Sequence, residues 1–355
     1  MSPYGHWRRR VVHWISAYKA RKMLPTVKYV HLLHNDKFAK PFVDFLNRNF
    51  PTTEHLVLCQ RTANHPFPIG PNVLEVRKFF KGINLDRPNI DKIICHSLFI
   101  NEIVDYLYTH PKLLREKAYW LIYGGDLYDA PRDEKNDFVR KNFKGFLATY
   151  DASVLKEKYG AKNIRVVTIP WNMEYAMLNK VLTPNKQYIQ IQINNSCAKS
   201  TLEMLEYISR FSNENIRIVT IASYGDLQFK EQIDLRGHEL FGDKYQSVSK
   251  MMSPKEYIQH LASNDILILN QDRQQGCGNA ITSFYLGVKV FIKSTTTPYQ
   301  TYRHTGIAVY DALKIKAMTF SEFIDKSGLS QNKSLAERLY NEKHWALHWQ
   351  NALEN

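Results

Sequence analysis

Residues 266–292 read ILILNQDRQQGCGNAITSFYLGVKVFI, and this stretch shows the pattern from which the fold is built. A short apolar run bounded by polar residues, Ile266 to Leu269, predicts a buried strand, and Val288 to Ile292 predicts the next strand. The segment between them contains a loop and then a helical pattern. The stretch is therefore expected to form one βαβ unit, the building block of a parallel sheet.

The loop of this unit carries two glycines, Gly276 and Gly278. Asn279 is expected to cap the helix that follows, which runs to Tyr285 and ends at Gly287. Backbone N–H groups at such a helix start have no partner inside the helix and lie at the positive end of its dipole, where a phosphate group binds well. An ordinary turn has the same spacing, so the loop alone leaves both interpretations open.

Length and composition limit the classes of protein to consider. A chain of 355 residues exceeds what one hydrophobic core usually organises, so two domains are expected. Because 44% of the residues are hydrophobic, the chain is globular, and no apolar run is long enough to span a membrane. The amino terminus lacks the pattern of a secretory signal. Four cysteines without metal spacing predict reduced, mostly buried thiols in the cytoplasm: Cys59, Cys95, Cys197 and Cys277.

The positive charge is concentrated at the amino terminus. The formal net charge is +14, and residues 1–25 contain six bases and no acid. Within this basic segment the larger apolar residues, among them Trp7, Trp14 and Tyr18, recur on one helical face. A basic amphipathic helix of this kind predicts binding to an anionic membrane surface, and packing on the protein's own surface is the alternative. Nucleic acid also attracts such charge, but no DNA- or RNA-binding module is recognisable.

From Val27 onward, strand and helix patterns alternate in two similar halves. Strands are expected at 27–33, 55–59, 92–96, 118–122, 147–149, 164–169, 188–193, 216–221, 266–269 and 288–292. Helices are expected at 40–50, 102–108, 133–143, 152–159, 200–210, 229–240 and 279–285, and a capping box, Ser253 with Glu256, starts one more. The polar residues 183–186 suggest the joint between the halves.

The sequence therefore predicts an α/β protein with two doubly wound, Rossmann-like domains facing a cleft. The expected divisions are a basic amphipathic segment at 1–25, a first domain at 26–184 and a second domain at 185–355. The helical tail from Ser334 is expected to pack back across the joint.

Three polar loops follow successive strands of the second half, namely 194–196, 223–225 and 273–279. In doubly wound domains ligands bind outside the carboxyl ends of the strands, so these loops are expected to converge. Amide and hydroxyl donors together with the Arg273 guanidinium would suit the diphosphate of a nucleotide. A Walker P-loop and a dinucleotide G-x-G-x-x-G are both absent from the sequence, which disfavours kinases, ATPases and dehydrogenases.

The notable stretch of the first half is YWLIYGGDLYD, residues 119–129. An apolar strand runs into Gly124 and Gly125, which let a ligand approach the backbone, and Asp126 follows at the strand end. A carboxylate there can take a proton from a hydroxyl, although a Gly-Gly turn with a capping aspartate is a common structural alternative. Three further side chains lie at strand ends and can share this site: His34, Asp36 and His96.

Two of these segments resemble motifs of one enzyme family. YGGDLY at 123–128 and RQQGCGN at 273–279 are similar to the W-G-[AG]-D-L-Y and R-Q-Q-G-x-G motifs of the TDP-N-acetylfucosamine:lipid II N-acetylfucosaminyltransferases, also called 4-alpha-L-fucosyltransferases. HNDKF at 34–38, HSLF at 96–99 and NNS at 194–196 extend the resemblance to about residues 28–346. Tyr123 and Asn279 differ from the residues that are frequent in the family.

The resemblance implies a GT-B glycosyltransferase that moves an amino or deoxy sugar from a nucleotide donor, such as TDP-N-acetylfucosamine, to an undecaprenyl-pyrophosphate-linked glycan. The pathways are those of enterobacterial common antigen and O-antigen, at the cytoplasmic face of the bacterial inner membrane. No metal or other cofactor is expected, because helix N-termini and basic side chains neutralise the leaving diphosphate. The partners are then the nucleotide sugar, the lipid-linked glycan and the anionic membrane surface, without nucleic acid.

The glycosyltransferase hypothesis also gives each candidate residue a role. Asp126 is the favoured general base, with His96 and Asp36 as the other candidates. The donor residues are Asn195, Ser196, Tyr224, Arg273, Gln275, Gly276, Gly278 and Asn279, and the acceptor residues are His34, Gly124, Gly125 and Tyr128. Inverting and retaining courses both remain open, and in a retaining reaction Asp126 becomes a positioning residue. The alternatives from other classes are a nucleotide-sugar epimerase of similar layout and a non-catalytic nucleic-acid-binding protein.

Overall fold

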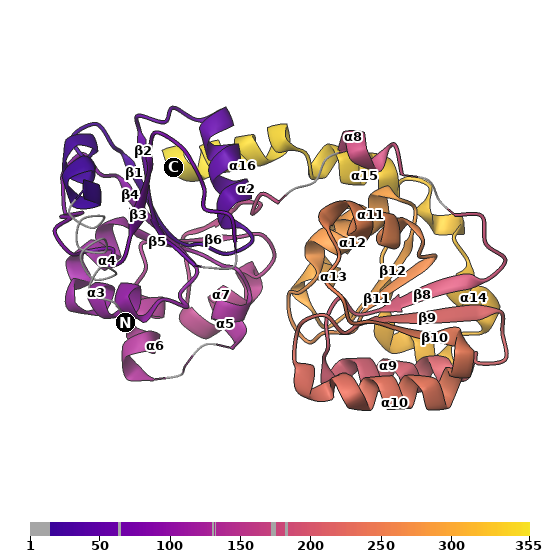
Figure 1. The fold of residues 1–355 in the computed structure, drawn as a ribbon. Helices are drawn as coiled ribbons and strands as arrows, with labels where there is room; N and C mark the ends of the chain where they lie inside the picture. Colours follow the sequence, from indigo (N-terminus) through magenta and orange to yellow (C-terminus); the bar gives the residue numbers. More distant parts are fainter. Residues whose placement is uncertain (1–14, 63–64, 130, 132, 172–174, 182–183) are drawn as a thin grey trace, which may run out of the picture. The chain divides into compact units, whose positions relative to one another are not determined.

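The computed structural model describes residues 15–62, 65–129, 131, 133–171, 175–181 and 184–355. It divides into two compact units (Figure 1). Unit 1 comprises Met1–Asn172 and Glu342–Asn355, and unit 2 comprises Met173–Asn341. The boundary between the two units thus falls at residue 172 instead of the predicted 184. The last segment, Glu342–Asn355, belongs to unit 1 and not to the predicted second domain. Part of the basic amphipathic segment, residues 1–14, lies outside the described residues, whereas residues 15–23 are helical.

Unit 1 is built on a seven-stranded sheet with the order β3-β2-β1-β4-β5-β6-β7. Every pairing is parallel, so each strand ends at the same edge of the sheet. The order reverses between β1 and β4, as in a doubly wound fold. The strands are β1 (Tyr29–His34), β2 (His55–Gln60), β3 (Val73–Val76), β4 (Lys92–His96), β5 (Ala118–Leu121), β6 (Gly145–Ala148) and β7 (Ile164–Val166).

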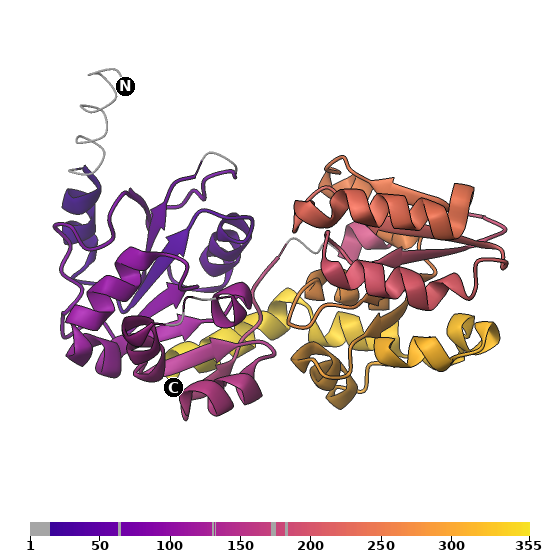
Figure 2. The same ribbon diagram turned by 90° about the horizontal axis from the view of Figure 1, so that it is seen from below.

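Helices cover both faces of this sheet because successive residues of the central strands, which point to opposite faces, are buried and mostly apolar. Leu32 faces one core layer together with residues 15–23 and most of the helices, whereas Leu33 faces the layer covered by α2 and α16. The views agree that the C-terminal helix lies against unit 1 (Figures 1 and 2). The helices are α2 (Ala39–Asn49), α3 (Asn101–Thr109), α4 (Pro111–Lys117), α5 (Gly125–Tyr128), α6 (Glu134–Lys141), α7 (Ala152–Tyr159) and α16 (Glu342–Glu354).

Helix α16 is bound to unit 1 by apolar packing and by polar contacts. Trp349 is fully buried against Phe42 of α2, with ring centroids 5.1 Å apart, and its indole N–H donates to the carbonyl oxygen of Thr168 over 2.9 Å. The Lys92 ammonium donates to two carbonyl oxygens at the end of α16, at 2.9 and 2.6 Å. Since these carbonyls lie at the negative end of the helix dipole, the buried lysine stabilises the helix end.

Unit 2 repeats the pattern with a six-stranded parallel sheet in the order β10-β9-β8-β11-β12-β13. Here the order reverses between β8 and β11. Figure 1 shows α9 and α10 on one face and α11, α12 and α13 on the other. The strands are β8 (Ile189–Ile193), β9 (Ile216–Ile221), β10 (Tyr245–Val248), β11 (Ile266–Leu269), β12 (Lys289–Ile292) and β13 (Tyr310–Asp311). The α-helices are α8 (Tyr175–Leu178), α9 (Lys199–Ser209), α10 (Lys230–Phe241), α11 (Pro254–Ala262), α12 (Cys277–Tyr285), α13 (Thr297–His304), α14 (Phe320–Ile324) and α15 (Asn332–Leu339).

The central strands and several helices form where the sequence predicts them. β4, β9, β11 and α7 begin and end at the predicted residues, and the capping box of Ser253 and Glu256 starts α11. The three strands that the sequence did not predict, β3, β10 and β13, all lie at a sheet edge. An edge strand is covered less than a central one, so its apolar run is short and interrupted by polar residues.

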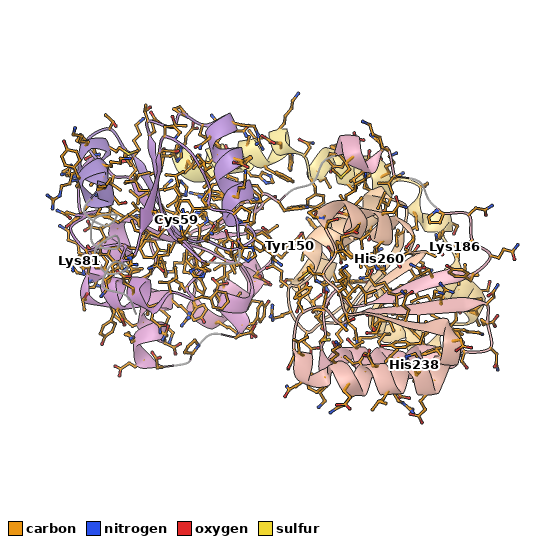
Figure 3. The ribbon with its side chains drawn as sticks, viewed as in Figure 1. Cys59, Lys81, Tyr150, Lys186, His238 and His260 are labelled. Atoms are coloured by element: carbon orange, nitrogen blue, oxygen red, sulfur yellow. The ribbon has the colours of Figure 1, made fainter. Side chains whose placement is uncertain are left out.

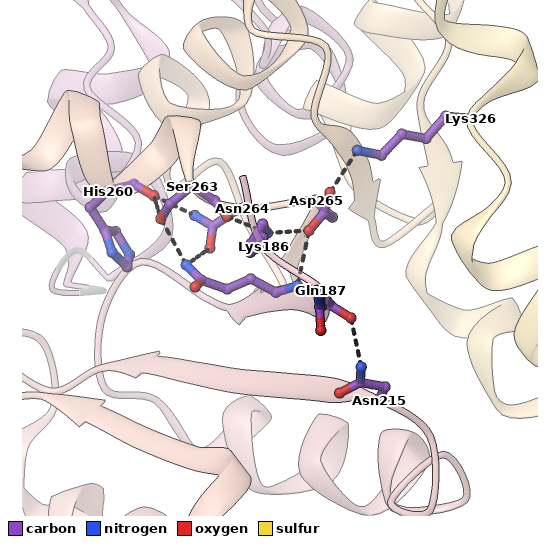
Figure 4. A network of polar contacts seen from close by, with 9 residues as sticks. Lys186, Gln187, Asn215, His260, Ser263, Asn264, Asp265 and Lys326 are labelled. Carbon is purple, nitrogen blue, oxygen red and sulfur yellow. Dashed lines mark hydrogen bonds and ion pairs between the residues drawn. The ribbon is translucent and has the colours of Figure 1, made fainter. Parts of the chain in front are cut away.

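The strand starts of unit 2 are joined by a polar network (Figure 4). The Asp265 carboxylate pairs with the Lys186 ammonium, accepts a hydrogen bond from the Lys326 ammonium at 3.0 Å and accepts one from the Gln190 N–H at 3.0 Å. Burial alone would raise the pKa of Asp265, but these three donors leave that pKa below its usual range. The network fixes the beginning of β8 beside that of β11. It lies at the opposite end of these strands from the loops that follow them.

No helix in the described residues is long and apolar enough to cross a membrane.

Candidate functional site

The reversal of strand order defines where ligands are expected in each unit. At a reversal the two flanking loops leave the sheet toward opposite faces, and a crevice opens between the strand ends. In unit 1 this point lies between the ends of β1 and β4, and in unit 2 between the ends of β8 and β11. The two described non-glycine residues with positive φ, Ser97 at 67° and Asn194 at 55°, immediately follow β4 and β8. Such strained backbone concentrates at functional sites.

In unit 2 the three predicted loops converge on Asn195. Its amide nitrogen donates to the Tyr224 hydroxyl over 2.9 Å, and its amide oxygen accepts from the Gln271 amide over 2.8 Å. The Gln275 amide donates to the Ser196 hydroxyl over 2.8 Å. These contacts join the ends of β8, β9 and β11, as the sequence predicted. Asn195 and Ser196 are both buried, so their orientation is fixed by the fold.

The glycine loop approaches the same asparagine. Gly276 has φ of +70°, and a Cβ built on it would lie 3.1 Å from the Asn195 amide oxygen. Gly276 is also the N-cap of α12, so the expected cap at Asn279 is wrong. Because Gly276 adopts the left-handed backbone conformation, the loop ends and the helix begins three residues before Asn279. The Asn279 amide instead donates to the Tyr257 hydroxyl over 2.8 Å.

The N-terminus of α12 therefore presents backbone donors beside these loops. Its first intrahelical hydrogen bond runs from Ala280 N–H to Gly276 carbonyl, so the N–H groups of Gly278 and Asn279 precede it. Arg273 is half-buried in the same loop, and one of its guanidinium nitrogens donates to the Gln274 carbonyl oxygen at 3.3 Å. Helix dipole, amides and guanidinium together form an environment suited to an anion.

The ends of β1, β4 and β5 carry the candidates of unit 1. Asp126 is 1% exposed, and three groups donate to its carboxylate, namely the Trp120 indole at 2.6 Å and the backbone N–H groups of Tyr123 at 3.0 Å and Leu98 at 3.2 Å. Burial raises the pKa of Asp126 to about 6, against the lowering effect of these donors. The carboxylate holds the end of β4 and the loop after β5 together.

His96 belongs to a buried chain of hydrogen-bonded side chains. The Tyr123 hydroxyl lies 3.2 Å from His96 Nδ1, His96 Nε2 lies 3.1 Å from His31 Nδ1, and His31 Nε2 lies 3.1 Å from His55 Nδ1. Burial lowers the pKa of His96 to about 3 and that of His55 to about 4, and it holds the pKa of His31 well below 6.5.

All three rings of this chain are therefore neutral near pH 7. Each neutral imidazole has one donor and one acceptor, so the three rings share one direction of donation. This series of hydrogen-bonded side chains fixes the position of the Tyr123 hydroxyl at the carboxyl ends of the strands.

Asp36 is the candidate that retains access to a ligand. Its Oδ1 accepts the backbone N–H groups of Phe38 at 2.8 Å and Ala39 at 3.2 Å, which turns the chain into α2. No described residue donates to its Oδ2, and the side chain is half-buried. Burial raises the pKa of Asp36, which makes the carboxylate a stronger base than an exposed one.

The predicted acceptor residues lie near the same carboxyl ends of the unit 1 strands. His34 is exposed at the end of β1, and Gly124, with φ of 99°, is the N-cap of α5. A Cβ on Gly125 would lie 2.9 Å from the Phe99 ring, so only glycine fits there without displacing that ring. The Tyr128 hydroxyl donates to the Asp151 carboxylate over 2.8 Å and thereby faces α7.

Sequence reasoning missed several residues of these sites. His31 and His55 lie inside predicted strands, where a histidine looks like any other buried residue, and Gln271 gives no motif of its own. The positive φ of Ser97 has no sequence signal, because serine rarely adopts it. Within the described residues, no group of three or more histidine, cysteine, aspartate or glutamate side chains has a metal-binding arrangement.

Solved structures with a similar fold include glycosyltransferases of the GT-B type. A glycosyltransferase from Rickettsia africae is 13% identical, with 92% of this chain and 97% of that chain covered and a TM-score of 0.63. Sucrose-phosphate synthase from Thermosynechococcus elongatus is 11% identical, with 92% and 98% covered and a TM-score of 0.64. HepE from Anabaena, in complex with UDP and glucose, is 10% identical, with 92% and 99% covered and a TM-score of 0.63. These low identities establish the GT-B fold.

Among curated proteins, no sequence matches the chain significantly. The sequence profile of one family, described as 4-alpha-L-fucosyltransferase glycosyl transferase group 56, matches residues 87–318. This range includes both motifs, YGGDLY and RQQGCGN, and it spans more than half of the chain. With the GT-B fold, this match shows that the chain is a glycosyltransferase and belongs to the 4-alpha-L-fucosyltransferase family, glycosyl transferase group 56.

Proposed function

We propose that the protein transfers an amino or deoxy sugar of the N-acetylfucosamine type from a TDP-type nucleotide to an undecaprenyl-pyrophosphate-linked glycan. The setting would be the synthesis of a surface polysaccharide, enterobacterial common antigen or O-antigen, by a peripheral enzyme at the cytoplasmic face of the inner membrane. The observation that carries the proposal is the convergence of three loops on Asn195 beside the N-terminus of α12, in a chain of this family.

Unit 2 is the proposed donor-binding unit. The Arg273 guanidinium and the first-turn N–H groups of α12 would bind the diphosphate, and Asn195 and Tyr224 would orient the rest of the donor. HepE, which shares the fold, was solved with UDP and glucose, and this supports a nucleotide sugar as the class of donor. A diphosphate held by these groups leaves more easily, because its developing charge is already compensated.

Unit 1 is the proposed acceptor-binding unit. In an inverting reaction a base takes the proton of the acceptor hydroxyl as that oxygen attacks the anomeric carbon. We assign this role to Asp36, whose Oδ2 accepts from no described residue, and we assign a positioning role to Asp126, whose carboxylate is enclosed by three donors. His96 would position the Tyr123 hydroxyl in the same way.

The donor assignment predicts that Arg273→Ala weakens TDP binding about tenfold or more, because a charge-assisted hydrogen bond contributes about 1.5–3 kcal/mol. Isothermal titration calorimetry with TDP measures the effect. Arg303→Ala removes an exposed arginine of α13 in the same unit and is expected to leave the affinity unchanged. Equal affinities for wild type and Arg273→Ala would remove Arg273 from the donor site.

The base assignment predicts that Asp36→Asn lowers the rate of sugar transfer about 100-fold while TDP binding is retained. Asp126→Asn keeps most of its hydrogen-bonding geometry and is expected to lower stability more than it lowers the rate. Transfer is measured with a lipid-linked acceptor, and the anomeric configuration of the product shows whether a base is needed. The reverse ranking of the two variants would return the base to Asp126.

The class of enzyme is tested by product formation. Thermal stabilisation by TDP or UDP, without stabilisation by an oligonucleotide, supports a nucleotide-sugar enzyme over a nucleic-acid-binding protein. Product that appears only when the lipid-linked acceptor is present supports a transferase over an epimerase. Sugar conversion without any acceptor would refute the proposal.

A further inference from the structure

A cavity of about 460 Å³ lies in unit 1 among residues that the candidate sites do not use. It is lined by the helix at residues 15–23, the loop between β3 and β4, and Tyr106 of α3. This volume is in the range of small-ligand sites. The lining residues are Arg21, Leu24, Phe80, Gly82, Ile83, Asn84, Arg87 and Tyr106.

The wall of this cavity combines apolar residues with two arginines. Leu24 and Ile83 are buried, and the rings of Phe80 and Tyr106 stack with centroids 3.6 Å apart. Arg87 Nε is shielded from solvent and donates to no acceptor among the described residues. The Arg87 side chain as a whole is half-buried and lines the cavity, so a ligand oxygen there would accept from the exposed part of its guanidinium.

Arg21 supplies the second guanidinium of the cavity. Its Nε donates to the Gly82 carbonyl oxygen over 3.3 Å, which fixes the side chain against the loop. In the described structure, Arg21 and Arg87 form no ion pair with a carboxylate. Two guanidinium groups beside a small polar and apolar wall are suited to a phosphate group, because the planar fork matches the geometry of its oxygens.

The surroundings of the cavity are strongly basic. Five further exposed cations lie on the helix and on the loop after β3, and none is ion-paired with a described residue: Lys19, Lys22, Arg77, Lys78 and Lys81. Figure 3 shows Lys81 at the surface of unit 1. The loop carries two carboxylates, Asp86 and Asp91, and Asp86 contributes after burial to the raised pKa of Tyr106. The excess of cations favours an anionic ligand or surface.

The same helix also exposes apolar side chains. Ile15 and Tyr18 are 48% and 59% exposed, next to Lys19 and Lys22, whereas Ala20 and Leu24 of this segment are buried in the core. Exposed apolar residues among lysines and arginines are typical of a helix at a membrane interface. A soluble phosphate compound would need the arginines but not the exposed Ile15 and Tyr18, so these two residues favour a lipid.

We propose that this cavity binds the phosphate of an anionic phospholipid headgroup through Arg21 and Arg87 while Ile15 and Tyr18 contact the membrane interface. The inference rests on the membrane-peripheral part of the proposed function and gives it a specific site. The enzyme is then held at the membrane by a site that belongs to unit 1 alone, separate from the residues assigned to donor and acceptor.

The test is flotation of the full-length protein with vesicles of phosphatidylcholine, with and without a quarter of phosphatidylglycerol. The wild type is expected to float with the anionic vesicles only. Arg21→Lys/Arg87→Lys keeps the charge but removes the guanidinium forks, and it is expected to weaken vesicle binding about tenfold. Lys78→Arg/Lys81→Arg is the matched control and is expected to bind like the wild type. Equal binding by both variants would overturn the proposal, since vesicle binding would then depend on positive charge alone and not on the two guanidinium groups.

Further measurements separate the sources of phosphate and the two proposals. Inorganic phosphate at constant ionic strength is expected to compete only at tens of millimolar. Micromolar binding of phosphate without vesicle binding would overturn the lipid assignment.

Affinity for TDP, which reports on unit 2, is expected to be unchanged in the double arginine variant. Loss of TDP binding with an unchanged melting temperature would contradict the separation of the two sites. Failure of wild-type TDP binding with intact flotation would refute the donor assignment and leave this inference standing.

Discussion

Replacing Trp349 by alanine is expected to destabilise unit 1 by about 3–5 kcal/mol. The indole is fully buried, packs on Phe42 and His96, and donates to the Thr168 carbonyl oxygen. Its removal leaves a cavity between α16 and the sheet and an unsatisfied carbonyl. The loss is large because α16 closes one whole core layer of the unit and comes from the far end of the chain.

Urea unfolding followed by tryptophan fluorescence measures this effect selectively, because tryptophan occurs only in the segments that form unit 1. Leu347→Ala on the same helix is the control. Leu347 is 54% exposed, so its replacement is expected to change the unfolding free energy by about 0.5 kcal/mol or less. A midpoint for Trp349→Ala equal to that of the control would mean that α16 does not stabilise unit 1.

Unit 1 is also expected to lose stability steeply as the pH falls below 6. His31, His55 and His96 are buried and neutral, with pKa values below 6.5, so the unfolded chain binds three protons that the folded unit does not. Asp126 acts in the opposite direction, since its folded pKa of about 6 lies above that of an unfolded aspartate. Burial also raises the pKa of Asp36 and lowers that of His348, both in unit 1, and these two effects oppose each other. The net difference of two protons lowers the unfolding free energy by about 3 kcal/mol per pH unit between pH 6 and pH 4. The full stability is present above pH 6.5.

Urea midpoints at pH 7, 6 and 5 measure this slope through the same fluorescence signal. His55→Phe keeps the ring contacts with Tyr29 and Phe50 and removes one titrating group, so the slope is expected to fall by about 1.4 kcal/mol per pH unit. His65→Phe, at an exposed position of the same unit, is expected to keep the wild-type slope. Constant stability from pH 7 to pH 5 would refute the neutral histidine chain.

The two sites differ in how far the sequence predicted them. The loops of unit 2 were predicted as a group because each follows an apolar strand, and parallel strands end at one edge. Their contacts through Asn195 confirm that they converge, whereas the roles assigned to individual donor residues stay predictions. In unit 1 the motif around Asp126 gave the position, but its burial under three donors was not visible in the motif. Access to solvent depends on neighbouring strands that the local sequence does not contain.

The sequence by itself determined the parallel α/β class, most central strands, the glycine loop and the family, because these depend on local periodicity and on motifs within short windows. The tertiary structure decided which residues meet. It assigned the C-terminal helix to unit 1, joined His31, His55 and His96 across three strands, and left Asp36 rather than Asp126 accessible. Such contacts join residues far apart in the chain, and they form only when the sheet register brings the strands side by side.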